Sequence, residues 1–407
     1  MRTAFTKEQL SDPHMQESER ALRTCIHCGF CTATCPTYVL LGDERDGPRG
    51  RIMLIQQMLE SGKPPAPETV THIDRCLSCL GCKTACPSGV DYSALIDTAR
   101  LHIAKTYQRP FAERMLRSFV LFLLMRPGLF SLATGLARVF APMLPGKLGA
   151  MAKKAARKQP KKLVAPPIAA PQGSHRIALL KGCVQSALAP EIDAAATRVL
   201  ARRKIAAQPM QGCCGALAYH MGNEAVAKRE AMRVIETFER SGAEALCMTA
   251  TGCSAFLKDY GRVFAGDEQW EKRARAFAAK VKDFTEIAAP AKANTVSDLT
   301  IAYHPPCSLQ HAQKLRGHGE ALLTAAGFKI AEIPDSHMCC GSAGSYSLLQ
   351  PKIAEALRAK KLEAIRSTGA NLIASANIGC LAHLSGEIPA AHIAELVDWA
   401  EGGPNPL

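Results

Sequence analysis

The sequence predicts a mixed fold in which an α-helical, cysteine-rich N-terminal domain is followed by two α/β domains that repeat each other. Three observations support this. One cysteine motif occurs twice near the N-terminus, a second cysteine pattern occurs twice in the rest of the chain, and apolar runs alternate with helical segments there. Alternation of strands and helices is typical of α/β domains. The 407 residues also exceed the roughly 250 to 300 at which a single core stops growing.

The first cysteine motif is the strongest signal in the chain. It reads Cys25-x2-Cys28-x2-Cys31-x3-Cys35-Pro36 and returns as Cys76-x2-Cys79-x2-Cys82-x3-Cys86-Pro87. Three closely spaced thiolates can hold three corners of a [4Fe-4S] cubane, while the fourth cysteine, followed by proline, points away. Structural zinc is the alternative, but zinc sites usually use pairs of cysteines and leave the third one without a role. The motif therefore predicts two [4Fe-4S] clusters.

The double motif resembles that of two-cluster ferredoxins, where the fourth cysteine of each motif serves the other cluster. The helical pattern of residues 49–61 makes the domain similar to the helical dicluster half of succinate dehydrogenase-type iron-sulfur subunits. We thus expect an α-helical dicluster 4Fe-4S ferredoxin-like domain. The resemblance implies that cluster one is held by Cys25, Cys28, Cys31 and Cys86, and cluster two by Cys76, Cys79, Cys82 and Cys35.

The second repeat covers roughly residues 174–290 and 299–400. Equivalent cysteines of the two copies are 124, 126 and 127 residues apart, so the copies are nearly in register. Cys247 belongs to neither cysteine repeat. It lies in an apolar run and is interpreted as a small buried side chain. The first copy contains Cys183, Cys213-Cys214-Gly215 and Gly252-Cys253, and the second contains Cys307, Cys339-Cys340-Gly341 and Gly379-Cys380.

Short apolar runs precede most of these cysteine groups. Ligands collect outside the carboxyl ends of the strands in parallel sheets. We therefore expect the four cysteines of each copy to meet at one sheet edge, as ligands of a further cluster or as redox thiols. The predicted buried strands are residues 177–180, 245–248, 301–303 and 372–374, and the predicted helices are residues 191–203, 224–240, 314–326 and 353–366.

The Cys-Cys-Gly signature resembles the duplicated cysteine-rich domain of heterodisulfide reductases, where a final C-x2-C supplies a fifth cysteine to an unusual cluster. Ala250 and Asn377 stand at the positions of that extra cysteine, which disfavours a five-cysteine, disulfide-cleaving centre. Ligation by four thiolates, or a copy without metal, is left open. His304, just before Pro305-Pro306-Cys307, is interpreted as a turn residue or hydrogen-bond donor rather than a ligand.

Charge and apolar patterning raise the question of a membrane. Between Lys147 and Lys162 the chain carries seven basic residues and no acid, followed by a proline-rich run. We interpret this stretch as a linker, with an anionic membrane surface or an acidic partner as the alternative. The basic residues are not interleaved with aromatics, so the net charge of +14 is not taken to indicate nucleic acid.

Residues 119–125 form an apolar run that ends at Arg126. Seven residues are far short of the roughly 20 that cross a bilayer. A buried core or subunit-facing helix is preferred over an interfacial membrane anchor, and residues 116–148 could contact either membrane or another subunit. The first 24 residues lack the apolar region of a secretory signal, so a cytoplasmic protein with reduced thiols is expected.

The chain has no Gly-x-Gly-x-x-Gly fingerprint after a strand and no evident flavin site. A separate flavoprotein is therefore expected to donate electrons. The order of parts resembles the iron-sulfur subunit of glycolate oxidase over nearly the whole chain. Local runs also match: Gly47-Pro48-Arg49-Gly50-Arg51-Ile52, Cys86-Pro87-Ser88-Gly89-Val90, Cys339-Cys340-Gly341-Ser342-Ala343-Gly344 and Asn377-Ile378-Gly379-Cys380.

This resemblance implies an oxidoreductase subunit that is not itself catalytic. FAD-containing partner subunits would oxidise glycolate to glyoxylate, and this chain would carry the electrons towards a quinone or another membrane acceptor, on the inner face of the cell membrane if it is peripheral. The alternatives are the matching subunit of anaerobic glycerol-3-phosphate dehydrogenase, a heterodisulfide reductase-like enzyme, and a redox sensor or scaffold. The expected domains are residues 1–110, a linking segment 111–173, and the copies 174–290 and 299–407.

Overall fold

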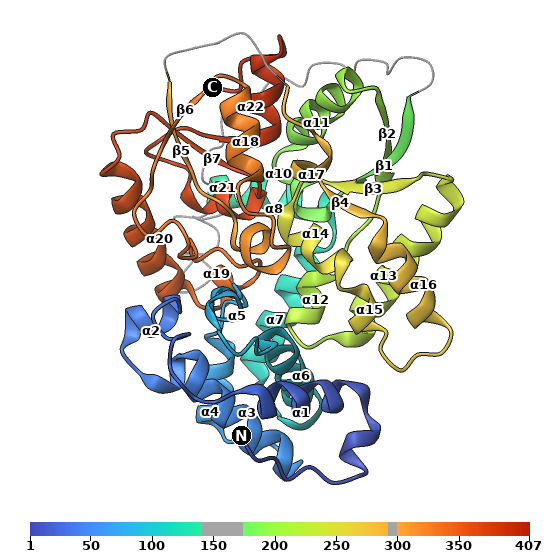
Figure 1. Ribbon diagram of the computed structural model, residues 1–407, viewed down its shortest axis with the longest axis vertical. Coiled ribbons are helices and arrows are strands. Elements are labelled where there is room, and N and C mark those ends of the chain that lie inside the picture. Colours follow the sequence, from blue (N-terminus) through green and yellow to red (C-terminus); the bar gives the residue numbers. More distant parts are fainter. Residues whose placement is uncertain (141–173, 292–298) are drawn as a thin grey trace.

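The computed structural model describes residues 1–140, 174–291 and 299–407, so the basic run and the prolines that follow it lie outside the described residues. The N-terminal helices form one end of the molecule, and two α/β halves lie side by side above them (Figure 1). Each half contains a four-stranded parallel sheet. The predicted mixed fold is confirmed.

The N-terminal part is helical, and four of its helices begin at a proline. Proline is favoured at the first helical position because its fixed φ suits the helix and it has no N–H to leave unpaired. The predicted helix over residues 49–61 is α3, and its Ile52, Ile55 and Leu59 are buried. The helices are α1 (Pro13–Thr24), α2 (Pro36–Leu41), α3 (Pro48–Ser61), α4 (Pro67–Asp74), α5 (Gly81–Ala85) and α6 (Tyr92–Thr106), with 3-10 turns at Gln9–Ser11 and Glu44–Asp46.

Two amphipathic helices, α7 (Phe111–Leu124) and α8 (Pro127–Phe140), follow. The apolar run falls in α7, where Val120 and Leu124 are buried while Phe119 and Phe122 are about half exposed. One face of this helix is therefore part of the core, and whether the other face meets a subunit or a membrane stays a prediction. No described helix is by itself long and apolar enough to span a membrane, although α7 and residues 127–133, bent by 108°, pass that test as a pair.

The two sheets have equivalent topology. Their strand orders are β2-β1-β3-β4 and β6-β5-β7-β8. All four predicted strands are present, as β1, β3, β5 and β7, whereas the strands beside them were not predicted. The bounds are β1 (His175–Lys181), β2 (Ile205–Gln211), β3 (Ala245–Met248), β4 (Val281–Asp283), β5 (Thr300–Tyr303), β6 (Lys329–Ala331), β7 (Leu372–Ser375) and β8 (Ala390–His392).

Helices connect these strands. In the first half they are α10 (Cys183–Leu188), α11 (Pro190–Arg202), α12 (Ala216–His220), α13 (Glu224–Ser241), α14 (Thr251–Lys258), α15 (Tyr260–Val263), α16 (Trp270–Ala279) and α17 (Phe284–Ile287). In the second half they are α18 (His318–Ala325), α19 (Tyr346–Leu349), α20 (Pro351–Arg366), α21 (Ile378–Leu384) and α22 (Ile393–Ala400).

One predicted helix, over residues 314–326, starts too early. Residues Ser308–Ala312 form a π-helical turn, and α18 begins only at His318. The backbone of Lys314 (φ 59°) and Gly317 (φ 77°) is left-handed, which a right-handed helix cannot accommodate. The helical periodicity of this segment could not reveal that break.

A shared core joins the two halves. It contains strand residues of both sheets, including Leu179 and Ile301, and it encloses Cys247, which is fully buried as predicted. Beside this core α11 packs on α22. Asp398 of α22 accepts hydrogen bonds from Arg198 (2.6 Å) and Arg202 (2.8 Å) of α11. A buried ion pair therefore links the halves.

Asp398→Asn is expected to destabilise the protein by about 3 kcal/mol, because it leaves the buried guanidinium of Arg198 without its carboxylate. Thermal or denaturant unfolding measures the effect. Glu387→Gln is the matched control, since the Glu387 side chain is 63% exposed in its pair with Arg366 and the change should cost less than about 1 kcal/mol. Equal losses in the two variants would contradict this account.

Candidate iron-sulfur sites

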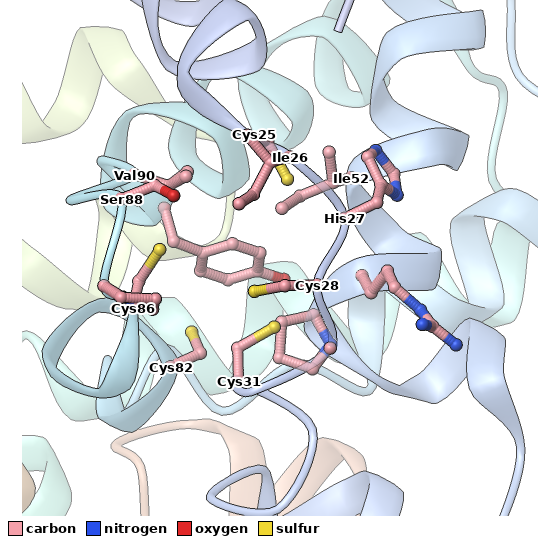
Figure 2. A pocket seen from close by; sticks show the side chains of 15 residues that line it. Cys25, Ile26, His27, Cys28, Cys31, Ile52, Cys82, Cys86, Ser88 and Val90 are labelled. Carbon is pink, nitrogen blue, oxygen red and sulfur yellow. The ribbon is translucent and has the colours of Figure 1, made fainter.

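The first motif wraps around one small cavity. Cys25, Cys28 and Cys31 line it together with Cys82 and Cys86 of the second motif, and Figure 2 shows these five side chains around the same space. The loop after α1 can turn this tightly because His27 (φ 55°) and Gly29 (φ 85°) adopt left-handed backbone conformations. The structure thus places four predicted ligands from two distant segments around one site.

The second motif repeats this loop. Ser78 (φ 52°) and Leu80 (φ 60°) have the left-handed conformations of His27 and Gly29, at the same distances from the first cysteine. Burial raises the pKa of Cys82 well above its ordinary value, and the nearby Cys79, Cys76 and Cys35 raise it further. Cys35 of the first motif therefore lies with the cysteines of the second, which is the crossed arrangement implied by the ferredoxin resemblance.

The chemistry of these thiols fits a metal cluster. Burial raises the pKa of Cys31 to about 11, and neighbouring cysteines add to the effect. Several thiolates cannot be held close together away from water unless a positive charge compensates them. Iron ions in a cubane provide that compensation and are ligated by four cysteines.

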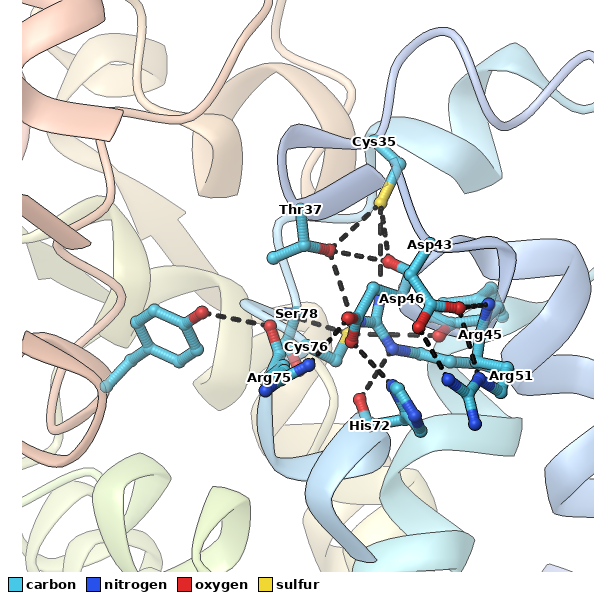
Figure 3. Close-up of polar contacts among 12 residues, drawn as sticks. Cys35, Thr37, Asp43, Arg45, Asp46, Arg51, His72, Arg75, Cys76 and Ser78 are labelled. Atoms are coloured by element: carbon cyan, nitrogen blue, oxygen red, sulfur yellow. Dashed lines mark hydrogen bonds and ion pairs between the residues drawn. The ribbon is translucent and has the colours of Figure 1, made fainter. Parts of the chain in front are cut away.

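A buried ionic network surrounds Cys35 (Figure 3). Asp46 receives hydrogen bonds from Arg51 (3.4 Å) and Arg75 (2.8 Å), and its carboxylate lies 2.9 Å from His72 Nδ1. Arg51 also donates to Cys35 Sγ at 3.9 Å. Arg51 was not predicted to be functional, although a basic residue on the apolar face of a predicted helix was an available signal.

Arg51→Met is expected to lower the reduction potential of the neighbouring cluster by on the order of 100 mV, because a buried positive charge that favours the reduced state is lost. Arg51→Lys keeps the charge and should shift the potential much less. An EPR-monitored redox titration of dithionite-reduced protein measures both variants. Equal potentials in the wild-type and Met variants would refute the electrostatic role.

The four cysteines of the first copy meet beyond the carboxyl ends of β1, β2 and β3. Cys213 lies 3.6 Å from Cys183, sulfur to sulfur. Hydrogen bonding with Cys183 and Cys214 lowers the pKa of Cys213. Hydrogen bonding with Cys213 and Cys253 raises the pKa of Cys214. We call Cys183, Cys213, Cys214 and Cys253 the first tetrad.

The second copy has the same arrangement. Cys307 is hydrogen-bonded to Cys339, which raises the pKa of Cys307. Cys340 is in turn hydrogen-bonded to both Cys339 and Cys380. We call Cys307, Cys339, Cys340 and Cys380 the second tetrad. The fifth-cysteine positions remain occupied by Ala250 and Asn377, so each tetrad offers four thiols.

The backbone geometry explains why each Cys-Cys-Gly run ends in glycine. Gly341 has φ +93°, and a Cβ there would lie 2.7 Å from the carbonyl oxygen of Ala354 in α20. Gly215 has φ +84° and lies nearly as close to α13, where a Cβ would be 3.0 Å from the carbonyl oxygen of Ala227. Only glycine combines a left-handed turn with this approach to a helix. The motif thereby fixes two adjacent thiols at the sheet edge.

A cavity of about 800 Å³ lies where the three parts of the chain meet. All eight tetrad cysteines line it, together with Cys76 of the second motif. Apolar side chains of α7 and α8, such as Leu123 and Phe130, form another wall, and Asp97, His220 and Arg262 form a polar part. The cavity is thus shared by cysteines, apolar residues and ionisable groups.

Comparisons with known proteins agree with this architecture. A 4Fe-4S dicluster domain model matches residues 21–90, and a cysteine-rich domain model matches residues 177–258 and 301–385. The chain is 40% identical to the glycolate oxidase iron-sulfur subunit of Escherichia coli (strain K12), over 98% of this chain and 99% of the relative. The chain belongs to the glycolate oxidase iron-sulfur subunit family.

A second relative extends this result. The probable glycolate oxidase iron-sulfur subunit of Bacillus subtilis (strain 168) is 30% identical over 95% of both chains. A solved structure, a hypothetical protein from Helicobacter pylori, covers 98% of this chain and is itself covered to 74%, with a TM-score of 0.55 and 9% identity, so it supports the fold alone.

Membership in the glycolate oxidase iron-sulfur subunit family establishes three points about this chain. It is a subunit of an oxidoreductase complex, its role is electron transfer, and it carries multiple [4Fe-4S] clusters. The family resemblance drawn from the sequence is therefore confirmed. The ligand set of each cluster is still a prediction.

Proposed function

We propose that this chain takes electrons from FAD-containing subunits that oxidise glycolate to glyoxylate and passes them to a quinone-type acceptor. The names of the two full-length relatives support glycolate over glycerol-3-phosphate as the substrate of the complex. The cavity beside the tetrads is the observation that supports an organic acceptor. When bound, [4Fe-4S] clusters supply one-electron transfer over a wide range of potentials.

The cysteines form a continuous series from the N-terminal helices to this cavity. Cys76 lines the cavity directly. Burial raises the pKa of Cys79, and the first neighbour that adds to the effect is Cys307 of the second tetrad. A ligand of the second predicted cluster therefore lies beside the second tetrad. This contact supports electron transfer from the dicluster part towards the tetrads.

The cavity suits an acceptor that takes up both electrons and protons. Reduction of a quinone to a quinol consumes two electrons and two protons, which convert both carbonyl oxygens to hydroxyl groups. Leu123, Leu124 and Phe130 would contact an apolar ring and tail. His220 lies 3.6 Å from Asp97, whose other carboxylate oxygen accepts a hydrogen bond from Arg262 at 3.3 Å. These groups would orient the carbonyls and relay protons from solvent.

Steady-state assays on the purified complex test this proposal. Glycolate should reduce the clusters and a soluble short-chain quinone, whereas glycerol-3-phosphate should reduce neither. Leu123→Trp should raise the KM for the quinone about tenfold by filling the cavity. Phe122→Trp, on the exposed face of the same helix, should not change it. An unchanged KM for the quinone in the Leu123 variant would show that the acceptor does not bind in this cavity.

We also propose that the outer face of α7 and α8 lies against the cytoplasmic surface of an anionic membrane. Phe111 is 68% exposed and Leu132 is 61% exposed, and Met115, Phe119, Phe122 and Leu129 extend the same apolar face. Arg114 and Arg126 lie over the rings of Phe111 and Phe122, and seven basic residues follow in the sequence. Basic side chains around an apolar face favour anionic lipid.

Flotation with liposomes tests this contact. The full chain should bind vesicles that contain anionic phospholipid and should bind purely zwitterionic vesicles less strongly. Phe111→Asp combined with Leu132→Asp should abolish binding while the iron content stays unchanged. If the assembled complex does not bind anionic vesicles although the isolated chain does, the face is covered by a partner subunit and the membrane proposal fails.

A further inference from the structure

The surroundings of the two tetrads differ at positions that the internal repeat makes equivalent. Three residues before the first cysteine, the first copy has Leu180 and the second has His304. Three residues before the last cysteine, the first copy has Ala250 and the second has Asn377, whose Nδ2 donates to Cys380 Sγ at 3.5 Å. Nitrogen-bearing side chains therefore stand at these positions only in the second copy.

The imidazole of His304 lies beside two sulfur atoms of the second tetrad. One of its ring nitrogens and the sulfur atoms of Cys340 and Cys380 all lie within 4.8 Å of one another. His304 is 1% exposed, and its Nδ1 has no hydrogen-bond partner within the described part of the chain. A buried polar atom without a partner is costly and usually indicates a missing ligand or water.

The fold does not explain why this residue is histidine. The backbone N–H of His304 donates to Ala374 (2.8 Å), and its carbonyl accepts from Ser375 Oγ (2.9 Å). Both bonds use backbone atoms, so any residue could make them. The equivalent strand of the first copy has Leu180, which is fully buried in the core. A leucine would therefore suit the strand, and the imidazole requires a separate reason.

We propose that His304 is a metal ligand of the second tetrad. It would supply a nitrogen donor next to Cys340 and Cys380. This donor would be the fifth from the protein and would take the role of the cysteine that is absent at Asn377. This inference rests on a cluster at the second tetrad, which is part of the proposed electron path. A neutral imidazole brings less negative charge to iron than a thiolate does, so the potential should be higher than it would be with a fifth cysteine in that role.

Pulsed EPR on dithionite-reduced protein tests the ligand directly. Protein labelled with ¹⁵N only in histidine should show a strongly coupled ¹⁵N signal from the cluster of the second tetrad. The signal should be lost in His304→Leu, which copies the first half of the molecule. His383→Leu removes a second histidine that lies near His304 and should retain the signal. The N-terminal clusters serve as an internal control for folding in every variant.

Each alternative outcome overturns the inference. A reduced tetrad cluster without strongly coupled histidine nitrogen would make His304 a hydrogen-bond donor only. A coupling that survives in His304→Leu would place the ligand elsewhere. Iron content that does not change in Cys339→Ser would mean that the second tetrad holds no cluster. Dithionite supplies the electrons, so a failure of the proposed glycolate reaction would leave this readout unaffected.

Discussion

Cys86→Ser is expected to give the same residual EPR spectrum as Cys28→Ser, although the two residues belong to different motifs. Both side chains line the first cavity, so either change should remove the first cluster and about four irons per chain. Cys35→Ser and Cys79→Ser should likewise match each other, because Cys35 lies with the second motif. Iron and acid-labile sulfide analysis with EPR on anaerobically purified protein provides the measurement.

A matched control is available within the same chain. Cys247 is fully buried in the shared core, and Cys247→Ala should leave the iron content unchanged. The crossed assignment fails if Cys86→Ser resembles the Cys79 variant instead of the Cys28 variant. Replacement of iron by zinc in the wild-type protein would contradict the cubane prediction itself.

Cys339→Ser is expected to lower the iron content by about four per chain, from about twelve or more, because it removes a central thiol of the second tetrad and with it one [4Fe-4S] cluster. Cys339 is hydrogen-bonded to both Cys307 and Cys340, so its loss interrupts the tetrad. Glycolate should still reduce the two N-terminal clusters, while quinone reduction by the complex should be lost.

The first tetrad supplies the control for this experiment. Cys213→Ser changes the equivalent position in the first copy and should retain the iron of the second tetrad. If the wild-type protein contains about eight irons and the Cys339 variant contains the same number, the tetrads are redox thiols or structural groups. The electron path would then end at the N-terminal pair.

Much of the fold could be predicted from local hydrophobic patterns in the sequence. Buried central strands are short apolar runs, and all four were predicted. The strands β2, β4, β6 and β8 at the sheet edges were missed because they are short or only partly apolar, as the exposed residues of β2 show. The helix predicted over residues 314–326 started too early, because hydrophobic periodicity does not reveal the left-handed backbone at Lys314.

The cysteines that could bind metal were also visible in the sequence, whereas the residues that surround each site could not be predicted. The Arg51 and Asp46 network joins residues from α3 and from the turn before it to His72 of α4 and to Arg75 just after that helix. Nothing in the spacing of these residues indicates that they meet around Cys35. His304 was interpreted as a turn residue or hydrogen-bond donor, and only its position beside Cys340 and Cys380 suggests a ligand.

The sequence by itself determined the number and kind of thiol groups, because cluster motifs are local: a fixed spacing of cysteines on a short loop is enough to present three sulfurs to one cubane. The two repeats and the full-length resemblance then identified the family. Tertiary structure alone decided which charges surround each site and that both tetrads share a cavity with α7 and α8. These features depend on contacts between segments far apart in the chain, which no local pattern encodes.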